Sequence, residues 1–212
     1  RDFHRAYAFV INVHIISSHI IDIYRLRYRT FLDASDNAPL EDLGRAVQFI
    51  TEHAGQFGVQ TEDYALIGYS SGGQMAGLFG NSKIGYARYG VPKPGALILA
   101  YPVIDFNEVK PVYHVLMDPA VYDWRFYSSS VADALTDDDP PTYFCYGKND
   151  FVLPLMDGRK QGPAFAQALE AHGVPYKKTV YQNAPHGCGT GCGTDAEGWL
   201  NNAVTFWEEQ TK

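Results

Sequence analysis

Residues 67–74 read Ile-Gly-Tyr-Ser-Ser-Gly-Gly-Gln, with three glycines around two adjacent serines. A short apolar run, residues 64–67, leads into the glycines, and a second one, residues 75–78, follows them. Apolar runs on both sides of a glycine cluster indicate a buried strand, an abrupt turn and a helix. The stretch therefore predicts a serine on a tight turn at the end of a strand.

The pentapeptide at 68–72, Gly-Tyr-Ser-Ser-Gly, fits the pattern Gly-x-Ser-x-Gly. This pattern is typical of a nucleophile elbow, a strained turn that lifts a serine oxygen above a sheet. Both glycines are expected because a Cβ at either position would meet the backbone on the other side of the turn. Ser71 is not framed by glycines at the same offsets, so Ser70 is the candidate nucleophile.

The composition favours one globular domain over residues 1–212. The chain has 46% hydrophobic and 14% aromatic residues, enough for a sizeable core, and only 19% charged residues. The net charge of -7 and the scattered Lys and Arg residues argue against nucleic acid as a partner. No run reaches the length of a membrane helix, and residues 1–5 do not resemble the start of a signal peptide. The chain begins at Arg1 and not Met, so we expect a fragment or a processed form.

The three cysteines, Cys145, Cys188 and Cys192, are too few for a disulfide scaffold and favour a cytoplasmic protein. Cys188 and Cys192 follow His186 with spacing that fits either a metal half-site or a local disulfide. No second ligand pair with zinc-like spacing occurs elsewhere, so we predict no metal and no cofactor.

Two strands are predicted near the start of the chain, at residues 7–13 and 19–24. Only residues 14–18 separate them, whereas neighbouring parallel strands need a crossover of about a dozen residues or more. A helix then begins near Pro39, with an apolar stripe along one face, and ends at Gly55 and Gly58. Strand, helix, strand, elbow and helix in this order predict an α/β fold with a mostly parallel sheet flanked by helices.

Further elements follow the elbow. Strands are predicted at 95–102, 142–146 and 177–181, a helix at Pro163–His172, and a last helix opened by a capping box, Thr194-Asp195-Ala196-Glu197. Residues 106–139 lack a sustained period and contain several aromatic residues. Such an insert is either a small lid or surface packing, and the lid is the preferred interpretation.

A serine hydroxyl needs a base within hydrogen-bond reach and an acid that orients the base. The seven histidines are at positions 4, 14, 19, 53, 114, 172 and 186. His53 and His172 lie near helix ends, where a structural role is the ordinary interpretation. Only His186 follows a late strand in a loop, between a proline and a glycine, so it is the candidate base.

The candidate acid is Asp150, which directly follows a predicted strand. Loops at the carboxyl ends of parallel strands gather the residues of a site, and Asp150 also gives the chain order Ser, Asp, His. Asp105 is the runner-up, because it follows the strand before. Asp137, Asp138 and Asp139 are interpreted as a solvated turn.

These motifs resemble those of α/β-hydrolases, in the esterase and lipase group related to hormone-sensitive lipase and the small bacterial acetyl esterases. The matching stretches, which span nearly the whole chain, are Tyr24-Arg25-Leu26, Pro39-Leu40-Glu41-Asp42, Gly68-Tyr69-Ser70-Ser71-Gly72-Gly73, Tyr101-Pro102-Val103, Pro140-Pro141-Thr142, Asp150 with Val152 and Pro154, and Pro185-His186-Gly187. The resemblance implies a catalytic triad of Ser70, Asp150 and His186, with the backbone N–H of Ser71 as a donor to the oxyanion.

The chain departs from that group at the glycine loop that supplies further oxyanion donors. His14 ends the matching strand, but residues 15–18 are Ile-Ile-Ser-Ser, and no glycine occurs before Gly44. The crossover is too short at the same place, so we hypothesise that roughly 20 to 30 residues are absent between His14 and Ser18. Each lost donor is expected to lower the rate by about 10² to 10³.

The sequence thus predicts a serine carboxylester hydrolase that acts on small or short-acyl esters through an acyl-enzyme. Two alternatives remain open, namely a serine peptidase or amidase with the same triad, and a catalytically impaired binding protein on a hydrolase scaffold. The expected partner is a small-molecule ester, and a homodimer is left open.

Overall fold

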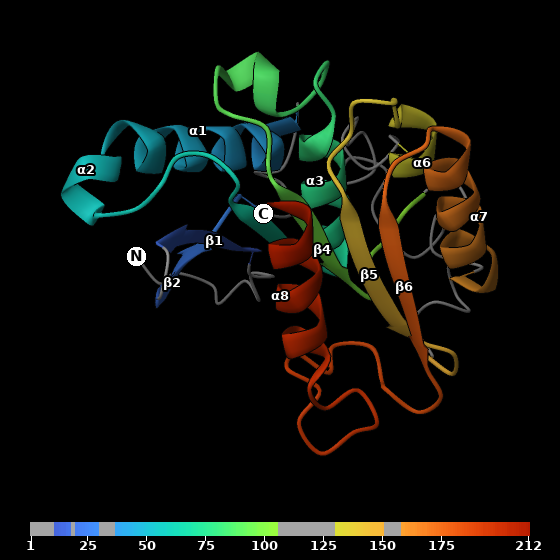
Figure 1. Ribbon diagram of the computed structural model, residues 1–212. Helices are drawn as coiled ribbons and strands as arrows, with labels where there is room; N and C mark the ends of the chain where they lie inside the picture. The colour runs from blue at the N-terminus through green and yellow to red at the C-terminus, as the bar shows by residue number, and fades with distance from the viewer. Residues whose placement is uncertain (1–10, 18–19, 30–36, 106–129, 151–157) are drawn as a thin grey trace, which may run out of the picture.

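The computed structural model describes residues 11–17, 20–29, 37–105, 130–150 and 158–212 (Figure 1). In these residues one sheet has the strand order β2-β1-β3-β4-β5-β6. The strands are β1 Ile11–Ser17, β2 Ile20–Leu26, β3 Ala65–Tyr69, β4 Ala96–Ala100, β5 Thr142–Gly147 and β6 Tyr176–Tyr181. Strands β3 to β6 are parallel, so their carboxyl ends meet at one edge of the sheet.

Helices cover both faces of the sheet, as the alternation of strands and helices predicts (Figure 1). They are α1 Ala38–Glu52, α2 Ala54–Phe57, α3 Ser71–Gly80, α6 Val131–Ala134, α7 Gly158–Ala171 and α8 Trp199–Gln210, with a 3-10 turn η2 at Tyr86–Tyr89. None of the helices in the described part of the chain is long and apolar enough to cross a membrane.

One face of the sheet packs against α1, α3, α6 and α7. Leu66, Leu97 and Phe144 point from three neighbouring strands into this core, where they meet Leu43 of α1 and Phe165 of α7. Successive residues of a strand point to opposite faces, so the neighbours of these residues belong to the other core. The larger helical layer therefore covers the face that carries the bulkier side chains of β3 and β4.

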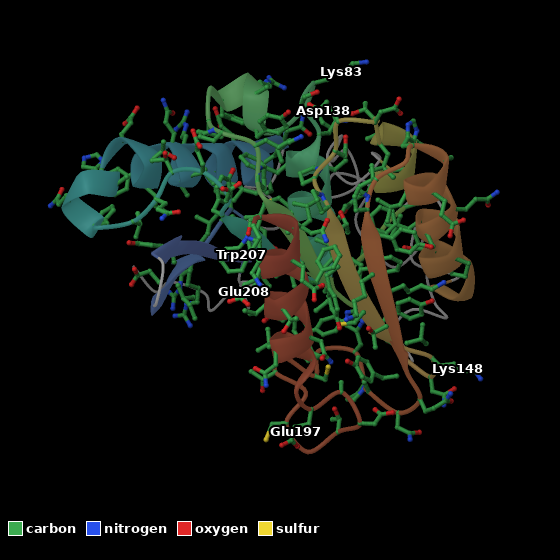
Figure 2. The ribbon with its side chains drawn as sticks, viewed as in Figure 1. Lys83, Asp138, Lys148, Glu197, Trp207 and Glu208 are labelled. Atoms are coloured by element: carbon green, nitrogen blue, oxygen red, sulfur yellow. The ribbon has the colours of Figure 1, made fainter. Side chains whose placement is uncertain are left out.

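The other face packs against α8. Its strand residues include Ala65, Ala96 and Ala100, and their small side chains make room for Trp199 and Trp207, each 1% exposed. Figure 2 shows Trp207 on α8. The packing of the two tryptophans fixes α8 on the sheet.

Helix α1 agrees with the sequence prediction in its start and its apolar face, but it ends at Glu52, before Gly55. Its buried residues include Leu40, Leu43, Val47 and Ile50, the stripe expected from their spacing, and a proline stands in its first turn. Gly58 closes α2 in the left-handed conformation, with φ of 69°.

The first two strands differ from the prediction. Strand β1 begins at Ile11, with residues 7–10 outside the described part, and it pairs antiparallel with β2 in a register that opposes Ser17 to Ile20. It is also antiparallel to β3. Antiparallel neighbours can be joined by a short turn, so the expectation of a parallel pair with a long crossover was wrong. The hypothesis of an absent segment then rests only on the missing glycines.

Two helix starts also differ from the prediction. The sequence predicted that helix α7 begins at Pro163. The helix begins earlier, at Gly158, and Pro163 lies in its second turn. Helix α8 begins after Gly198, so residues 194–197 are not a capping box. The Thr194 hydroxyl accepts the N–H of Ala196, two residues on, and the Glu197 carboxylate accepts the N–H of Gly193. These bonds close a turn in place of a helix end.

The predicted insert is described only in its last part. Residues 106–129 lie outside the described residues, and so does the lid interpretation that rests on their aromatic side chains. The described remainder forms α6, whose Ser130 side chain caps the helix by accepting the N–H of Asp133.

Candidate active site

Ser70 lies on a strained turn between β3 and α3. Its φ of 53° and ψ of -121° fall outside the regions that non-glycine residues ordinarily occupy. Two backbone bonds hold this conformation, since the Ser70 N–H donates to the Ala100 carbonyl at 3.0 Å and the Ser70 carbonyl accepts from the N–H of Val103 at 3.1 Å. The neighbouring strand end therefore fixes the turn, and the strain persists because the surroundings determine it.

Close backbone contacts explain two of the glycines. A Cβ on Gly68 would lie 2.3 Å from the carbonyl oxygen of Gly72, so the steric reason inferred from sequence holds at this position. A Cβ on Gly73 would lie 2.7 Å from the Cβ of Pro102. Sequence reasoning missed the role of Gly73, because its contact comes from the end of β4 and not from the turn itself.

The structure brings Ser70, His186 and Asp150 together. Oγ of Ser70 lies 2.8 Å from Nε2 of His186, and Nδ1 of His186 lies 2.7 Å from Oδ2 of Asp150. A carboxylate at Nδ1 selects the tautomer that carries its proton there, which leaves Nε2 to accept from the serine hydroxyl. The arrangement can remove a proton from Ser70 and return it to another oxygen.

The three side chains come from the carboxyl ends of three parallel strands. Ser70 follows β3, Asp150 follows β5, and His186 lies in the loop after β6. Figure 2 shows Lys148, two residues before Asp150 in the chain, and Glu197 at the same end of the molecule. The Asp150 side chain is fully buried and that of His186 is 10% exposed, so water has little access to their bond.

Ser71 is the first residue of α3. The first N–H groups of a helix have no intrahelical acceptor, so the Ser71 N–H lies where a negatively charged oxygen is favoured. The Ser71 side chain is hydrogen-bonded to Tyr28, and burial of this tyrosine raises the pKa of its phenol. Sequence reasoning missed Tyr28. This residue lies just after β2, belongs to the core and is only 7% exposed.

Gln161 binds the backbone of the alternative acid, Asp105. The backbone N–H of Asp105 donates to Oε1 of Gln161 at 3.3 Å, and its backbone carbonyl accepts from Nε2 of the same side chain at 3.0 Å. Asp150 occupies Nδ1 of His186, so the geometry favours Asp150 over Asp105.

The other predicted polar groups have local partners. His53 Nδ1 bonds to the carbonyl of Phe49 within α1, and His172 pairs with Asp137 at 2.7 Å. The prediction that residues 137–139 form a solvated turn was wrong for Asp139, which is buried. Asp139 is 6% exposed and accepts from Thr136, and burial raises the pKa of its carboxyl.

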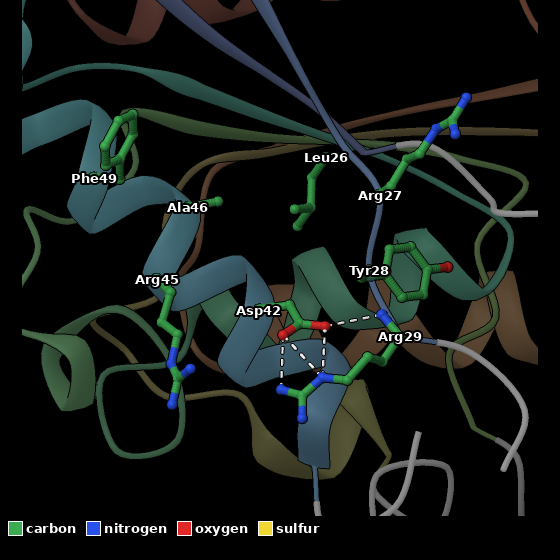
Figure 3. A pocket seen from close by; sticks show the side chains of 8 residues that line it. All are labelled: Leu26, Arg27, Tyr28, Arg29, Asp42, Arg45, Ala46 and Phe49. Atoms are coloured by element: carbon green, nitrogen blue, oxygen red, sulfur yellow. Dashed lines mark hydrogen bonds and ion pairs between the residues drawn. The ribbon is translucent and has the colours of Figure 1, made fainter. Parts of the chain in front are cut away.

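An open pocket of about 610 Å³ lies beside Tyr28 (Figure 3). It is lined by Leu26, Arg27, Tyr28, Arg29, Asp42, Arg45, Ala46 and Phe49. Arg29 binds Asp42 through its side chain and its backbone N–H, and it lowers the pKa of Glu41 by a further bond. Figure 3 shows the Tyr28 hydroxyl directed away from this ion pair.

The cysteines are free thiols. Cys188 is half-buried and Cys192 is exposed, so the structure does not contain the local disulfide considered from their spacing. Burial raises the pKa of the Cys188 thiol, and the nearby Asp150 and Asp195 add to this effect. Within the described ranges no three His, Cys, Asp or Glu side chains come together as a metal site would require.

One curated protein and several solved structures are similar to this chain. The chain is 27% identical over 181 residues to endo-1,4-beta-xylanase B of Butyrivibrio fibrisolvens, a match that covers 82% of this chain and only 28% of that protein. The chain thus spans less than a third of this curated relative.

Two solved structures resemble the fold. An acetyl ester-xyloside bifunctional hydrolase from Caldicellulosiruptor lactoaceticus superposes with a TM-score of 0.69 and 22% identity, over 89% of this chain and 71% of that one. A carboxylesterase from Lactobacillus plantarum superposes with a TM-score of 0.68 and 22% identity, over 83% and 69% of the two chains. These likenesses establish the α/β-hydrolase fold.

The model of the BD-FAE family matches residues 18–161, more than half of the chain. The match includes Ser70 and the candidate acid Asp150, and it ends before the loop of His186. By this match and by its fold, the protein belongs to the BD-FAE family of α/β-hydrolases.

Proposed function

We propose that the protein is a serine carboxylester hydrolase for small or short-acyl esters. The observation that carries the proposal is the unbroken chain of hydrogen bonds from Asp150 through His186 to Ser70. A buried carboxylate, an imidazole and a serine on a strained turn are the groups that acyl transfer requires.

The reaction begins when Ser70 Oγ attacks the ester carbonyl and His186 Nε2 takes the hydroxyl proton. Asp150 holds the imidazole in the correct orientation and stabilises its positive charge. The tetrahedral intermediate then expels the alcohol, which leaves with the proton from His186. Water attacks the acyl-serine in a second cycle of the same proton transfers, and the carboxylic acid is released.

The negative oxygen of the intermediate lies against the N–H of Ser71 in this mechanism. The chain has no glycine loop after β1 that could add further donors. Removal of one oxyanion donor lowers the rate of acyl transfer by about 10² to 10³, so we expect a slow esterase.

The names of the relatives narrow the substrate class. One is a xylanase and another hydrolyses acetyl esters and xylosides. We therefore propose acetyl esters of sugars or of other small alcohols as substrates, and the reaction needs no cofactor.

The test is covalent labelling with a fluorophosphonate, which reacts with an activated serine. The wild-type protein should be labelled, and the variant Ser70→Ala should not. The variant Ser71→Ala keeps the backbone N–H and should still be labelled. Labelling that persists in Ser70→Ala would show that another residue is the nucleophile.

The alternative functions predict different outcomes. A serine peptidase or amidase would be labelled too, but it would hydrolyse a p-nitroanilide at a rate comparable to p-nitrophenyl acetate. A binding protein on the hydrolase scaffold would fold with a normal melting transition and remain unlabelled.

A further inference from the structure

Tyr101 has a strained backbone directly after β4. Its φ is 38°, in a region that bulky residues rarely occupy, although its side chain is only 5% exposed. Its N–H donates to the carbonyl of Cys145 at 2.6 Å, which ties the strained residue to the neighbouring strand β5. Such conformations cost free energy and persist at sites where a side chain must have one fixed direction.

The Tyr101 side chain contacts the loop of the candidate base at two points. Its ring centroid lies 4.9 Å from that of His186, with 58° between the planes. Its hydroxyl accepts the N–H of Gly189 at 3.2 Å. Burial raises the pKa of this phenol, so it stays protonated at neutral pH.

Trp199, the first residue of α8, holds the same glycine. Its Nε1–H donates to the carbonyl of Gly189 at 2.9 Å, and its indole is 1% exposed. Tyr69 packs against both aromatic residues, with ring centroids 5.9 Å from Tyr101 and 6.0 Å from Trp199. The N–H and the carbonyl of Gly189 are therefore both bound by side chains of the rigid core, three residues after His186.

We infer that Tyr101 is a positioning residue for His186, acting together with Trp199 through Gly189. The glycine-rich loop after His186 has left-handed glycines at 187, 189, 191 and 193, and such a backbone has many alternative conformations. The two bonds to Gly189 restrict it, and the Tyr101 ring limits the rotation of the imidazole. Nε2 of His186 is thereby kept within 2.8 Å of Ser70 Oγ.

The inference rests on the proposed hydrolase function, since positioning matters only if His186 transfers a proton. Tyr101 is assigned no proton transfer of its own, because its ring contacts His186 and its hydroxyl binds Gly189. A small displacement of a catalytic group can lower the rate by about 10²-fold, so the effect is expected on kcat.

The chain contains a matched control for the loss of a buried phenol. Tyr143 belongs to the same core cluster as Tyr101 and is fully buried, and its hydroxyl bonds to Oγ1 of Thr179 in β6. Its ring stacks on Trp199, and the variant Tyr143→Phe keeps this ring. The variants Tyr101→Phe and Tyr143→Phe therefore remove the same atom from the same core.

The experiment measures kcat and KM for p-nitrophenyl acetate, the melting temperature, and the downfield proton signal of the bond between His186 and Asp150 by NMR. We expect Tyr101→Phe to lower kcat roughly 10- to 100-fold with KM changed less than about twofold. Its NMR signal should broaden or disappear. Tyr143→Phe should lower the melting temperature by a similar amount and keep both kcat and the signal.

A second variant tests the same positioning through a different residue, in case Tyr101→Phe does not fold. Trp199→Phe removes the other bond to Gly189 and should change kcat and the signal in the same direction. If Tyr101→Phe and Tyr143→Phe have equal kcat values and equal NMR signals, Tyr101 only fills the core and the inference is wrong. If the folded wild type hydrolyses no ester, the proposed function fails, and the NMR comparison still decides whether Tyr101 orients His186.

Discussion

Oδ2 of Asp150 lies 2.7 Å from Nδ1 of His186, and the Asp150 side chain is fully buried. The two residues are 36 positions apart and follow adjacent parallel strands, β5 and β6. In the proposed mechanism this pair fixes the tautomer of the imidazole, and with it the ability of Nε2 to accept a proton from Ser70.

Replacement Asp150→Asn should lower kcat by roughly 10⁴-fold, because an amide can stabilise the wrong imidazole tautomer and gives no charge to the imidazolium. KM for p-nitrophenyl acetate should change little. The matched control is Asp105→Asn, since Asp105 is the other aspartate that follows a strand at this edge. Equal losses in both variants, or a larger loss for Asp105→Asn, would contradict the assignment of the acid.

Replacement Gly68→Ala should destabilise the elbow, because the new Cβ would lie 2.3 Å from the Gly72 carbonyl oxygen. We expect a loss of about 1–3 kcal/mol in unfolding free energy and reduced labelling of Ser70. Gly55→Ala is the control, since a Cβ there meets nothing within 4 Å and the residue lies in α2. It should be neutral or stabilise the fold by up to about 1 kcal/mol in urea unfolding.

The three thiols should react with iodoacetamide in a fixed order. Exposed Cys192 should react first, half-buried Cys188 more slowly, and buried Cys145 only after unfolding. A raised pKa lowers the thiolate fraction of Cys188 at neutral pH, so its rate should rise nearly tenfold per pH unit until its pKa is reached. Peptide mapping by mass spectrometry measures each rate. Alkylation of Cys188 ahead of Cys192 at pH 7 would be the opposite result.

Replacement Asn81→Ala should lower the unfolding free energy by about 1–3 kcal/mol with kcat unchanged. Asn81 is 2% exposed, donates to the Ala134 carbonyl and accepts from the N–H groups that follow it, so its loss leaves several polar groups unpaired. Asn201→Ala, on the exposed face of α8, should change stability by less than about 0.5 kcal/mol. Denaturant melts of the two variants provide the comparison.

Local sequence predicted the elements whose conformation is decided by neighbours along the chain. The strand, the turn at Ser70 and helix α3 follow from glycines and apolar runs within a dozen residues, and α1 follows from its own apolar stripe. The prediction failed where distant packing decides, since strand β1 pairs antiparallel with two partners. It also failed locally at Thr194 and Glu197, whose side chains accept N–H groups one residue away from those of a capping box and so close a turn.

Buried polar groups were equally hard to predict. Asp139 looks like part of an acidic solvated run, yet it is buried and accepts from Asn81, 58 residues away in the chain, as well as from Thr136 in its own turn. Arg29 and Asp42 are 13 residues apart and meet only because β2 ends beside α1.

The sequence by itself determined that Ser70 lies on a tight turn between a strand and a helix, because the glycines of the elbow are a steric requirement of the local backbone. It also supplied the order of a serine, an aspartate and a histidine after successive strands. Only the tertiary structure decided that Ser70 and His186, which are 116 residues apart, lie within 2.8 Å. That distance and the hydrogen bond between Gly189 and Tyr101 both depend on the parallel strands, which bring their loops to one edge of the sheet. A contact between distant segments is decided by packing and not by local conformational preference.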